Sequence, residues 1–204
     1  FRIVEGVTYL ETDEGPIPLE IFGAHNLNNL AGAKWICQHM GIDEMDFYEA
    51  VVSFSGASKR LEKIASHKST VVFKDFAHAP SKVSATTAAV KHQYPHKRLL
   101  ACLELHTYSS LNESFLKEYK NTLDKADEAV VFYSPKALEI KHMKPLNPEQ
   151  ISMAFEHPNL KVCSDPLAFQ TLLKNQSYTN TALLLMSSGN YGGLNFDQLK
   201  NIIL

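Results

Sequence analysis

The chain has 204 residues, 45% of them hydrophobic and 21% charged, so it can form one globular domain, or one domain and part of a second. Its formal net charge of -2 gives no electrostatic reason to bind nucleic acid, and no apolar run approaches the roughly 20 residues that cross a bilayer. No basic start leads into an apolar stretch, so we expect a cytoplasmic protein without a signal peptide and without membrane or nucleic-acid partners.

The first part of the chain begins with two strand-like runs, 1–10 and 17–22, on either side of a turn at 13–16. A helix with apolar residues at helical spacing follows Gly23, and Asp43 is a residue type that caps a second helix. Because the chain starts within a strand-like run, we expect it to belong to a longer protein.

From residue 69 onward, apolar runs of strand length alternate with amphipathic stretches of helical length. The expected strands are 70–74, 98–103, 129–133, 160–163 and 181–187, and the expected helices are 80–93, 112–125, 148–155, 166–174 and 195–203. Strands that lack strict polar alternation are typical of a sheet covered on both faces. The pattern predicts a Rossmann-like, doubly wound α/β fold with a mostly parallel sheet, and a boundary between residues 1–66 and 67–204.

The first polar segment that can carry chemistry joins a strand to a helix at residues 23–29. Asn26 and Asn29 lie three residues apart and share one face of the expected helix. Their carboxamides offer a donor and an acceptor, which match the N6 and N7 edge of adenine. On spacing alone, a helix cap at Asn26 and a surface position for Asn29 is the simpler interpretation.

Two further segments offer cations and a carboxylate. Arg60 follows a glycine turn and can hold phosphate oxygens in a bidentate manner, although exposed cations in loops are common. Asp75, His78 and Lys82 follow the strand 70–74, and open parallel sheets bind ligands beyond such strand ends. Asp75 can accept hydrogen bonds from ribose, and the other two can meet a carboxylate. Alternatively, Asp75 only ends the strand and His78 packs against the following proline.

The last two candidate segments also follow expected strands, at 104–110 and 187–193. The first is rich in hydrogen-bonding side chains, and the three glycines of the second allow a nest of N–H groups that can hold an anion. Both can equally be simple connections. The nine histidines and three cysteines show no zinc-ligand spacing, so we predict no metal site, and no G-x-x-x-x-G-K-[ST] phosphate loop is present.

Taken in order, three motifs resemble the Mur ligases, which build and salvage the peptide of peptidoglycan. They are Gly-x-His-Asn-x-x-Asn at 23–29, Phe-x-Gly at 54–56 followed by Lys-Arg, and Asp-Phe-Ala-His-x-Pro at 75–80. The resemblance implies that residues 1–66 end the central ATP-binding domain and that residues 67–204 form the carboxy-terminal domain. It implies ATP and magnesium as cofactors, with the magnesium ligands in the missing part of the central domain. It also implies UDP-N-acetylmuramate and a murein peptide or amino acid as substrates, and leaves the oligomeric state open.

The resemblance also implies roles for individual residues. Asn26 and Asn29 would hold adenine with His25 beside them, Arg60 would reach the phosphates, and Asp75 would bind ribose. The incoming amine would be bound by His78, Lys82, His106, Thr107, Tyr108, Ser109 and Asn190. We assign no catalytic residue, because the lysine and the magnesium that act in phosphoryl transfer belong to the missing phosphate-loop region.

Within the family, the motifs at 75–80 and 186–193 look most like the recycling ligase that joins L-alanyl-γ-D-glutamyl-meso-diaminopimelate to UDP-N-acetylmuramate. The ligase that adds L-alanine is the alternative. Its Pro-His-Arg-Tyr-Thr-Arg segment carries arginines that this chain lacks at 106–110, and both enzymes usually have a second histidine where Ala79 stands. A non-catalytic α/β binding module is an alternative of another class. This chain, without a phosphate loop, is expected to be inactive by itself.

Overall fold

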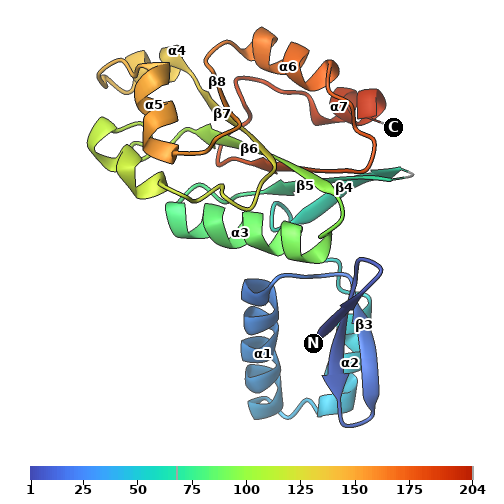
Figure 1. The fold of residues 1–204 in the computed structure, drawn as a ribbon. Helices are drawn as coiled ribbons and strands as arrows, with labels where there is room; N and C mark the ends of the chain where they lie inside the picture. Colours follow the sequence, from blue (N-terminus) through green and yellow to red (C-terminus); the bar gives the residue numbers. More distant parts are fainter. Residues whose placement is uncertain (68, 204) are drawn as a thin grey trace.

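The computed structural model describes residues 1–67 and 69–203, which form two layered units, one above the other in Figure 1. The smaller unit contains a three-stranded antiparallel sheet and two helices. The larger unit contains a six-stranded sheet with helices on both faces. Within the described residues, no helix is long and apolar enough to cross a membrane.

The smaller unit begins with an antiparallel meander of three strands, β1 (Arg2–Val4), β2 (Val7–Thr12) and β3 (Gly15–Leu19). The single run predicted at 1–10 is two strands, because Glu5 and Gly6 have φ angles of 50° and 79° and turn the chain. The strand predicted at 17–22 begins earlier, at Gly15, and ends at Leu19.

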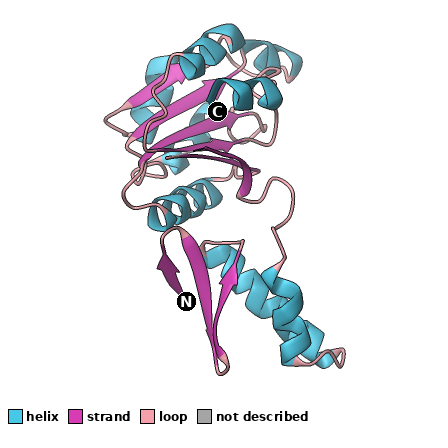
Figure 2. Ribbon diagram, turned by 90° about the vertical axis from the view of Figure 1, so that its right-hand side faces the viewer, coloured by secondary structure: helices cyan, strands magenta, loops and turns pink. Residues whose placement is uncertain are grey.

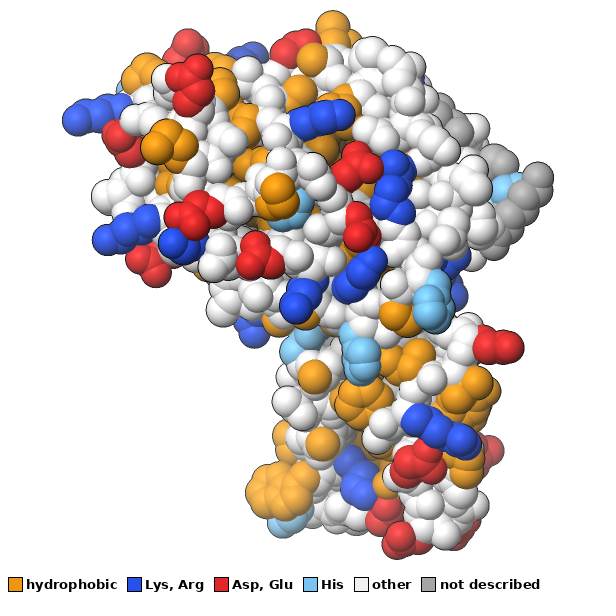
Figure 3. Space-filling view, viewed as in Figure 1, with side chains coloured by type: hydrophobic (Ala, Val, Ile, Leu, Met, Phe, Trp, Pro, Cys, Tyr) orange, Lys and Arg blue, Asp and Glu red, His pale blue; other side chains and the backbone are white. Residues whose placement is uncertain are grey.

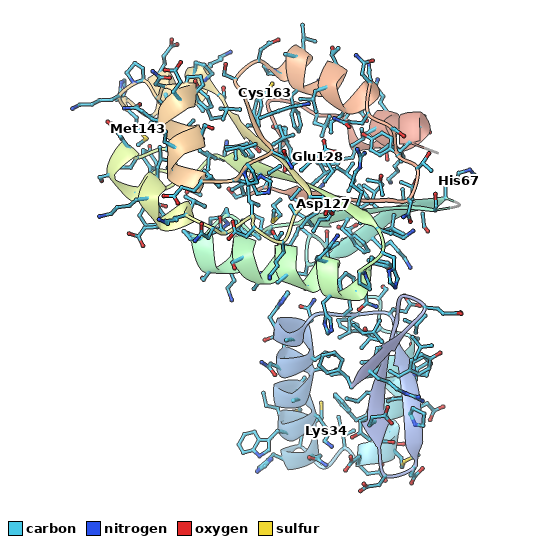
Figure 4. The ribbon with its side chains drawn as sticks, in the orientation of Figure 1. Lys34, His67, Asp127, Glu128, Met143 and Cys163 are labelled. Atoms are coloured by element: carbon cyan, nitrogen blue, oxygen red, sulfur yellow. The ribbon has the colours of Figure 1, made fainter. Side chains whose placement is uncertain are left out.

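Two helices complete this unit, α1 (Ala24–His39) and α2 (Glu44–Val52). Asp43 caps α2, as predicted, because its carboxylate accepts hydrogen bonds from the N–H groups of Met45 and Asp46 at 2.8 and 3.1 Å. Lys34 on α1, labelled in Figure 4, donates to Glu44 at 2.6 Å and joins the helices at the surface. The unit has its own small core, formed by Leu19, Ile21, Leu27, Leu30, Phe47 and Val51.

The larger sheet has the strand order β4-β5-β9-β6-β7-β8, and only β4 runs antiparallel to its neighbour. The strands are β4 (Glu62–His67), β5 (Thr70–Asp75), β6 (Arg98–Leu105), β7 (Glu128–Tyr133), β8 (Leu160–Cys163) and β9 (Thr181–Met186). The central strands β6, β7 and β9 are buried almost throughout, as expected for a sheet covered on both faces. The predicted doubly wound, mostly parallel α/β fold is confirmed.

Helices cover both faces of this sheet, as Figures 1 and 2 show. One face packs against α3 (Pro80–Gln93), η1 (Glu113–Tyr119), α4 (Pro135–Ile140) and α5 (Pro148–Phe155), and the other packs against α6 (Pro166–Lys174) and α7 (Phe196–Ile203). The helices α3, α5 and α6 begin and end where they were predicted. Each starts with a proline, whose missing N–H removes no helical hydrogen bond in the first turn.

Three secondary-structure elements differ from the prediction. The helix expected at 112–125 is wrong, because only residues 113–119 are helical, as the 3-10 helix η1, and Asn121 then adopts a φ of 61°. The short helix α4 and the edge strand β4 were not predicted. β4 is mostly polar and partly exposed, so its sequence lacks the apolar run by which the other strands were predicted. The boundary predicted between residues 66 and 67 falls within β4, which pairs with β5 in the larger sheet.

Candidate functional site

A cavity of about 790 Å³ lies between the two units, enclosed by the start of α1, the connection before β4, and the segment from the end of β5 into α3. Figure 3 shows histidine side chains and lysine or arginine side chains at the narrow region where the two units meet. The cavity brings together seven of the predicted site residues from three separate segments. They are His25, Asn26, Asn29, Arg60, Asp75, His78 and Lys82.

Asp75, the last residue of β5, is only 4% exposed and holds the connecting segment against the strand end. Its Oδ2 accepts a hydrogen bond from the N–H of Leu61 at 2.7 Å, and its Oδ1 accepts one from the N–H of Ala77 at 2.6 Å. The N–H of Phe76 donates to the carbonyl of Lys59 at 2.8 Å in the same place. Each carboxylate oxygen keeps a second lone pair, so Asp75 both ends the strand and remains able to accept from a ligand hydroxyl.

The first turn of α1 presents His25 and the two asparagines to the cavity. Asn26 donates its side-chain N–H to the carbonyl of Phe22 at 3.0 Å, which stabilises the strand-to-helix turn. Asn29 is exposed, and no hydrogen bond of its side chain occurs within the described parts of the chain. Of the two carboxamides, Asn29 therefore has both its donor and its acceptor available for a ligand.

Positive charge converges on this cavity. Partial burial lowers the pKa of His25, the Asp75 carboxylate acts in the opposite direction, and the nearby Lys82 and Arg60 lower the pKa further. His25 is therefore neutral at pH 7, and Lys82 and Arg60 are the lysine and arginine of the cavity lining. The first turns of α1 and α3 contain no acidic residue, so their N–H groups and positive helix ends add to an environment that favours an anion.

A second group of predicted residues lies at the carboxyl ends of β6 and β9. The N–H and the hydroxyl of Thr107 each donate a hydrogen bond to the hydroxyl of Ser110 at 3.0 Å. The hydroxyls of Thr107 and Ser109 lie 3.1 Å apart. The side chain of Asn190 accepts from the N–H of Gly193 at 3.1 Å. His106 directly follows β6, and its Nδ1 lies 3.5 Å from Oε1 of Glu104 in that strand.

The amine-binding residues predicted from sequence are thus divided between two places. His78 and Lys82 line the cavity, whereas His106, Thr107, Tyr108, Ser109 and Asn190 are absent from the lining formed by residues 1–67 and 69–203. The two places lie close together at the same edge of the sheet, because only one strand, β9, lies between β5 and β6.

Two residues of the second group, Glu104 and Ser187, lie in the candidate segments 104–110 and 187–193 but were given no individual role there. Glu104 is 2% exposed, and its carboxylate accepts a hydrogen bond from the hydroxyl of Ser187. The signal for Glu104 is a charged residue that directly follows the apolar run 99–103 of β6. No three His, Cys, Asp or Glu side chains cluster as a metal site in the described ranges, so no chemical step is assigned to a metal held by these residues.

The chain is an α/β protein with a doubly wound sheet, and its polar loops and cavity lie at the carboxyl edge of the strands, where open sheets of this kind bind ligands. Comparison of the sequence with known families then identifies the particular class. Residues 59–189 match the family described as "Mur ligase, glutamate ligase domain", and the chain belongs to this family.

The chain is similar in sequence to parts of longer enzymes. It is 33% identical over 131 residues to the bifunctional enzyme MurC/Ddl of Chlamydia caviae, covering 64% of this chain and 16% of that enzyme. It is 29% identical over 185 residues to the UDP-N-acetylmuramate–L-alanine ligase of Ruthia magnifica, covering 87% of this chain and 39% of that ligase. The chain therefore spans only a part of these relatives.

Solved structures share its fold. The UDP-N-acetylmuramate–alanine ligase of Thermotoga maritima superimposes with a TM-score of 0.65 at 18% identity, covering 92% of this chain and 39% of that one. A murein peptide ligase of Psychrobacter arcticus gives 0.61 at 21% identity, covering 93% and 39%. The family predicted from the motifs is confirmed, while these likenesses do not distinguish the peptide-adding from the alanine-adding member.

Proposed function

We propose that this chain is the part of an ATP-dependent ligase that closes over ATP and presents the amine substrate. In the reaction, ATP phosphorylates the carboxylate of UDP-N-acetylmuramate, because a free carboxylate is a poor electrophile. The amine then attacks the acyl phosphate, and phosphate leaves. The observation that carries the proposal is the cavity between the units, into which sequence-distant segments bring Asn29, Arg60 and Asp75.

Each part of ATP has a chemical counterpart in that cavity. The unengaged carboxamide of Asn29 suits the adenine edge, and the remaining lone pairs of Asp75 suit ribose hydroxyls. Arg60 and Lys82 suit phosphate oxygens. Magnesium, when bound, would neutralise phosphate charge, and we assign its ligands to the rest of the ATP-binding domain. The smaller unit would then be the end of that domain, and the larger unit, whose sheet begins with β4, would be the carboxy-terminal domain.

For the amine, we propose the murein peptide L-alanyl-γ-D-glutamyl-meso-diaminopimelate, and a role in peptidoglycan recycling. The motif at 75–80 and the closing motif at 186–193 support this choice, as does the lack of arginines at 106–110. The sequence relatives named above favour L-alanine as the alternative amine.

The proposal is tested with the complete ligase that contains this chain, by release of phosphate from ATP. We expect release only when UDP-N-acetylmuramate and the tripeptide are both present, and a slower reaction with L-alanine. Arg60→Ala should raise the KM for ATP, whereas Lys136→Ala, an exposed lysine on α4, should not. Binding of ATP without turnover of any amine would instead indicate a non-catalytic binding module.

A further inference from the structure

Glu104 is a buried carboxylate at the carboxyl end of β6, 2% exposed. Its Oε2 accepts hydrogen bonds from the hydroxyl of Ser187 and from the N–H of Tyr191, the latter at 2.8 Å. Burial of an unpaired carboxylate is costly, so these donors fix the side chain in one position. Glu104 thereby connects the end of β6 with the loop that follows β9.

The other carboxylate oxygen of Glu104 faces a histidine. Its Oε1 lies 3.5 Å from Nδ1 of His106, whose side chain is 41% exposed while that of Glu104 is 3% exposed. A carboxylate beside Nδ1 favours the tautomer with the proton on that nitrogen. The lone pair of Nε2 is then free to accept a proton from a ligand.

Gly189 shows that this arrangement is closely fitted. A Cβ at this position would lie 2.8 Å from Oε2 of Glu104, and 3.0 Å from both Cγ and Nδ1 of His106. The φ angle of Gly189 is not in the left-handed region, so the space taken by these two side chains is what requires a glycine. The N–H of Gly189 also donates to the hydroxyl of Ser187 at 2.7 Å.

Glu104, His106 and Ser187 lie close to the cavity between the two units, at the same edge of the sheet. β9 lies between β6 and β5, and the N–H of Ser187 donates to the carbonyl of Asp75 at 2.9 Å. An amine substrate that is bound partly in the cavity can therefore bring its ammonium group to His106, which follows β6.

We propose that His106 accepts a proton from the ammonium group of the amine substrate, and that Glu104 is the positioning residue that orients its imidazole. This inference rests on the proposed ligase function. The ammonium gives one proton to Nε2, and the lone pair of the resulting amine forms the C–N bond. The bond between the acyl carbon and the phosphate oxygen breaks, and phosphate leaves with that electron pair and a second amine proton.

The test compares two nucleophiles in the complete ligase at pH 7. The peptide amine is protonated and needs a base, whereas hydroxylamine is neutral and traps the acyl phosphate as a hydroxamate without one. We expect His106→Gln to lower the rate of peptide ligation about 100-fold, within the range of general-base catalysis, and to leave hydroxamate formation unchanged. Glu104→Gln, which keeps an acceptor for Ser187 and Tyr191, should lower peptide ligation about 10-fold with the same selectivity, because the residue that orients a histidine contributes less than the base itself.

His96→Gln is the matched control, an exposed histidine in the loop before β6, at the opposite end of that strand. It should leave both reactions unchanged. Equal losses of ligation and hydroxamate in His106→Gln would overturn the proposal, as would an unchanged rate of peptide ligation. If Glu104→Gln fails to fold, His106→Gln, a change at a partly exposed side chain, still provides the test. Absence of hydroxamate from the unmodified enzyme would instead refute the ligase function on which the inference rests.

Discussion

Asp75→Asn replaces one oxygen of a buried carboxylate by an NH₂ group and leaves the side-chain volume almost unchanged. In the native protein the two oxygens accept hydrogen bonds from the N–H groups of Leu61 and Ala77 at 2.7 and 2.6 Å. An asparagine can accept only one of these bonds, and its NH₂ group then faces the other N–H donor. One backbone N–H is left without an acceptor at a position that is 4% exposed.

Leaving a buried donor unsatisfied costs about 1–3 kcal/mol, so we expect the free energy of unfolding to fall by that amount. For a chain of this length, 1 kcal/mol corresponds to a change in Tm of about 2–4 °C, which gives a decrease of about 2–12 °C. The loss should be local, because Leu61 belongs to the segment that Asp75 holds at the strand end. Amide hydrogen exchange at Leu61 or Ala77 should therefore become faster.

The assay is thermal unfolding of the chain followed by circular dichroism, with Asp124→Asn as the control. Asp124 is exposed, and its substitution should leave Tm unchanged. A Tm of Asp75→Asn equal to that of the unmodified chain would refute the structural role, and Asp75 would then be free to act on ligand alone.

Three further predictions concern Gly23 and the part of α1 that follows it. In the complete ligase, Asn29→Ala should weaken ATP binding by about 1–3 kcal/mol and reduce discrimination against GTP, and unchanged calorimetric affinities would make Asn29 a surface residue only. Because burial lowers the pKa of His25, the unfolded chain takes up a proton there before the folded chain does, so stability should fall as pH drops below about 6.5. His25→Gln should flatten that part of the Tm–pH profile, and an identical profile would contradict this assignment. Gly23→Ala should destabilise the chain by about 1–3 kcal/mol in urea unfolding, since its Cβ would lie 2.8 Å from the Cβ of Ala89 and its φ is 88°. Gly41→Ala, with a φ of 87° and no atom within 4 Å, should cost less, and equal losses would show that contact with Ala89 is unimportant.

Local signals in the sequence were sufficient for much of the larger unit. A proline at the first position of α3, α5 and α6 marks helix starts that any tertiary context preserves, because φ of proline already suits a helix. The helix predicted at 112–125 was wrong because apolar spacing by itself does not require a continuous helix. Its apolar spacing places Leu116, Tyr119 and Leu123 in the core, but the turn at Asn121 achieves the same burial without a continuous helix.

For the candidate site, local sequence information and tertiary structure likewise decided different things. The sequence by itself determined the motifs, their position at strand ends, and the family, since each depends on a few neighbouring residues. Only the tertiary structure decided that His78 and Lys82 join the cavity between the two units, while His106 lies outside its described lining, beside Glu104. That separation depends on β9 lying between β5 and β6, although it follows both of them in the chain. Strand order arises from the burial of whole faces against distant helices, and no short segment of sequence contains that information.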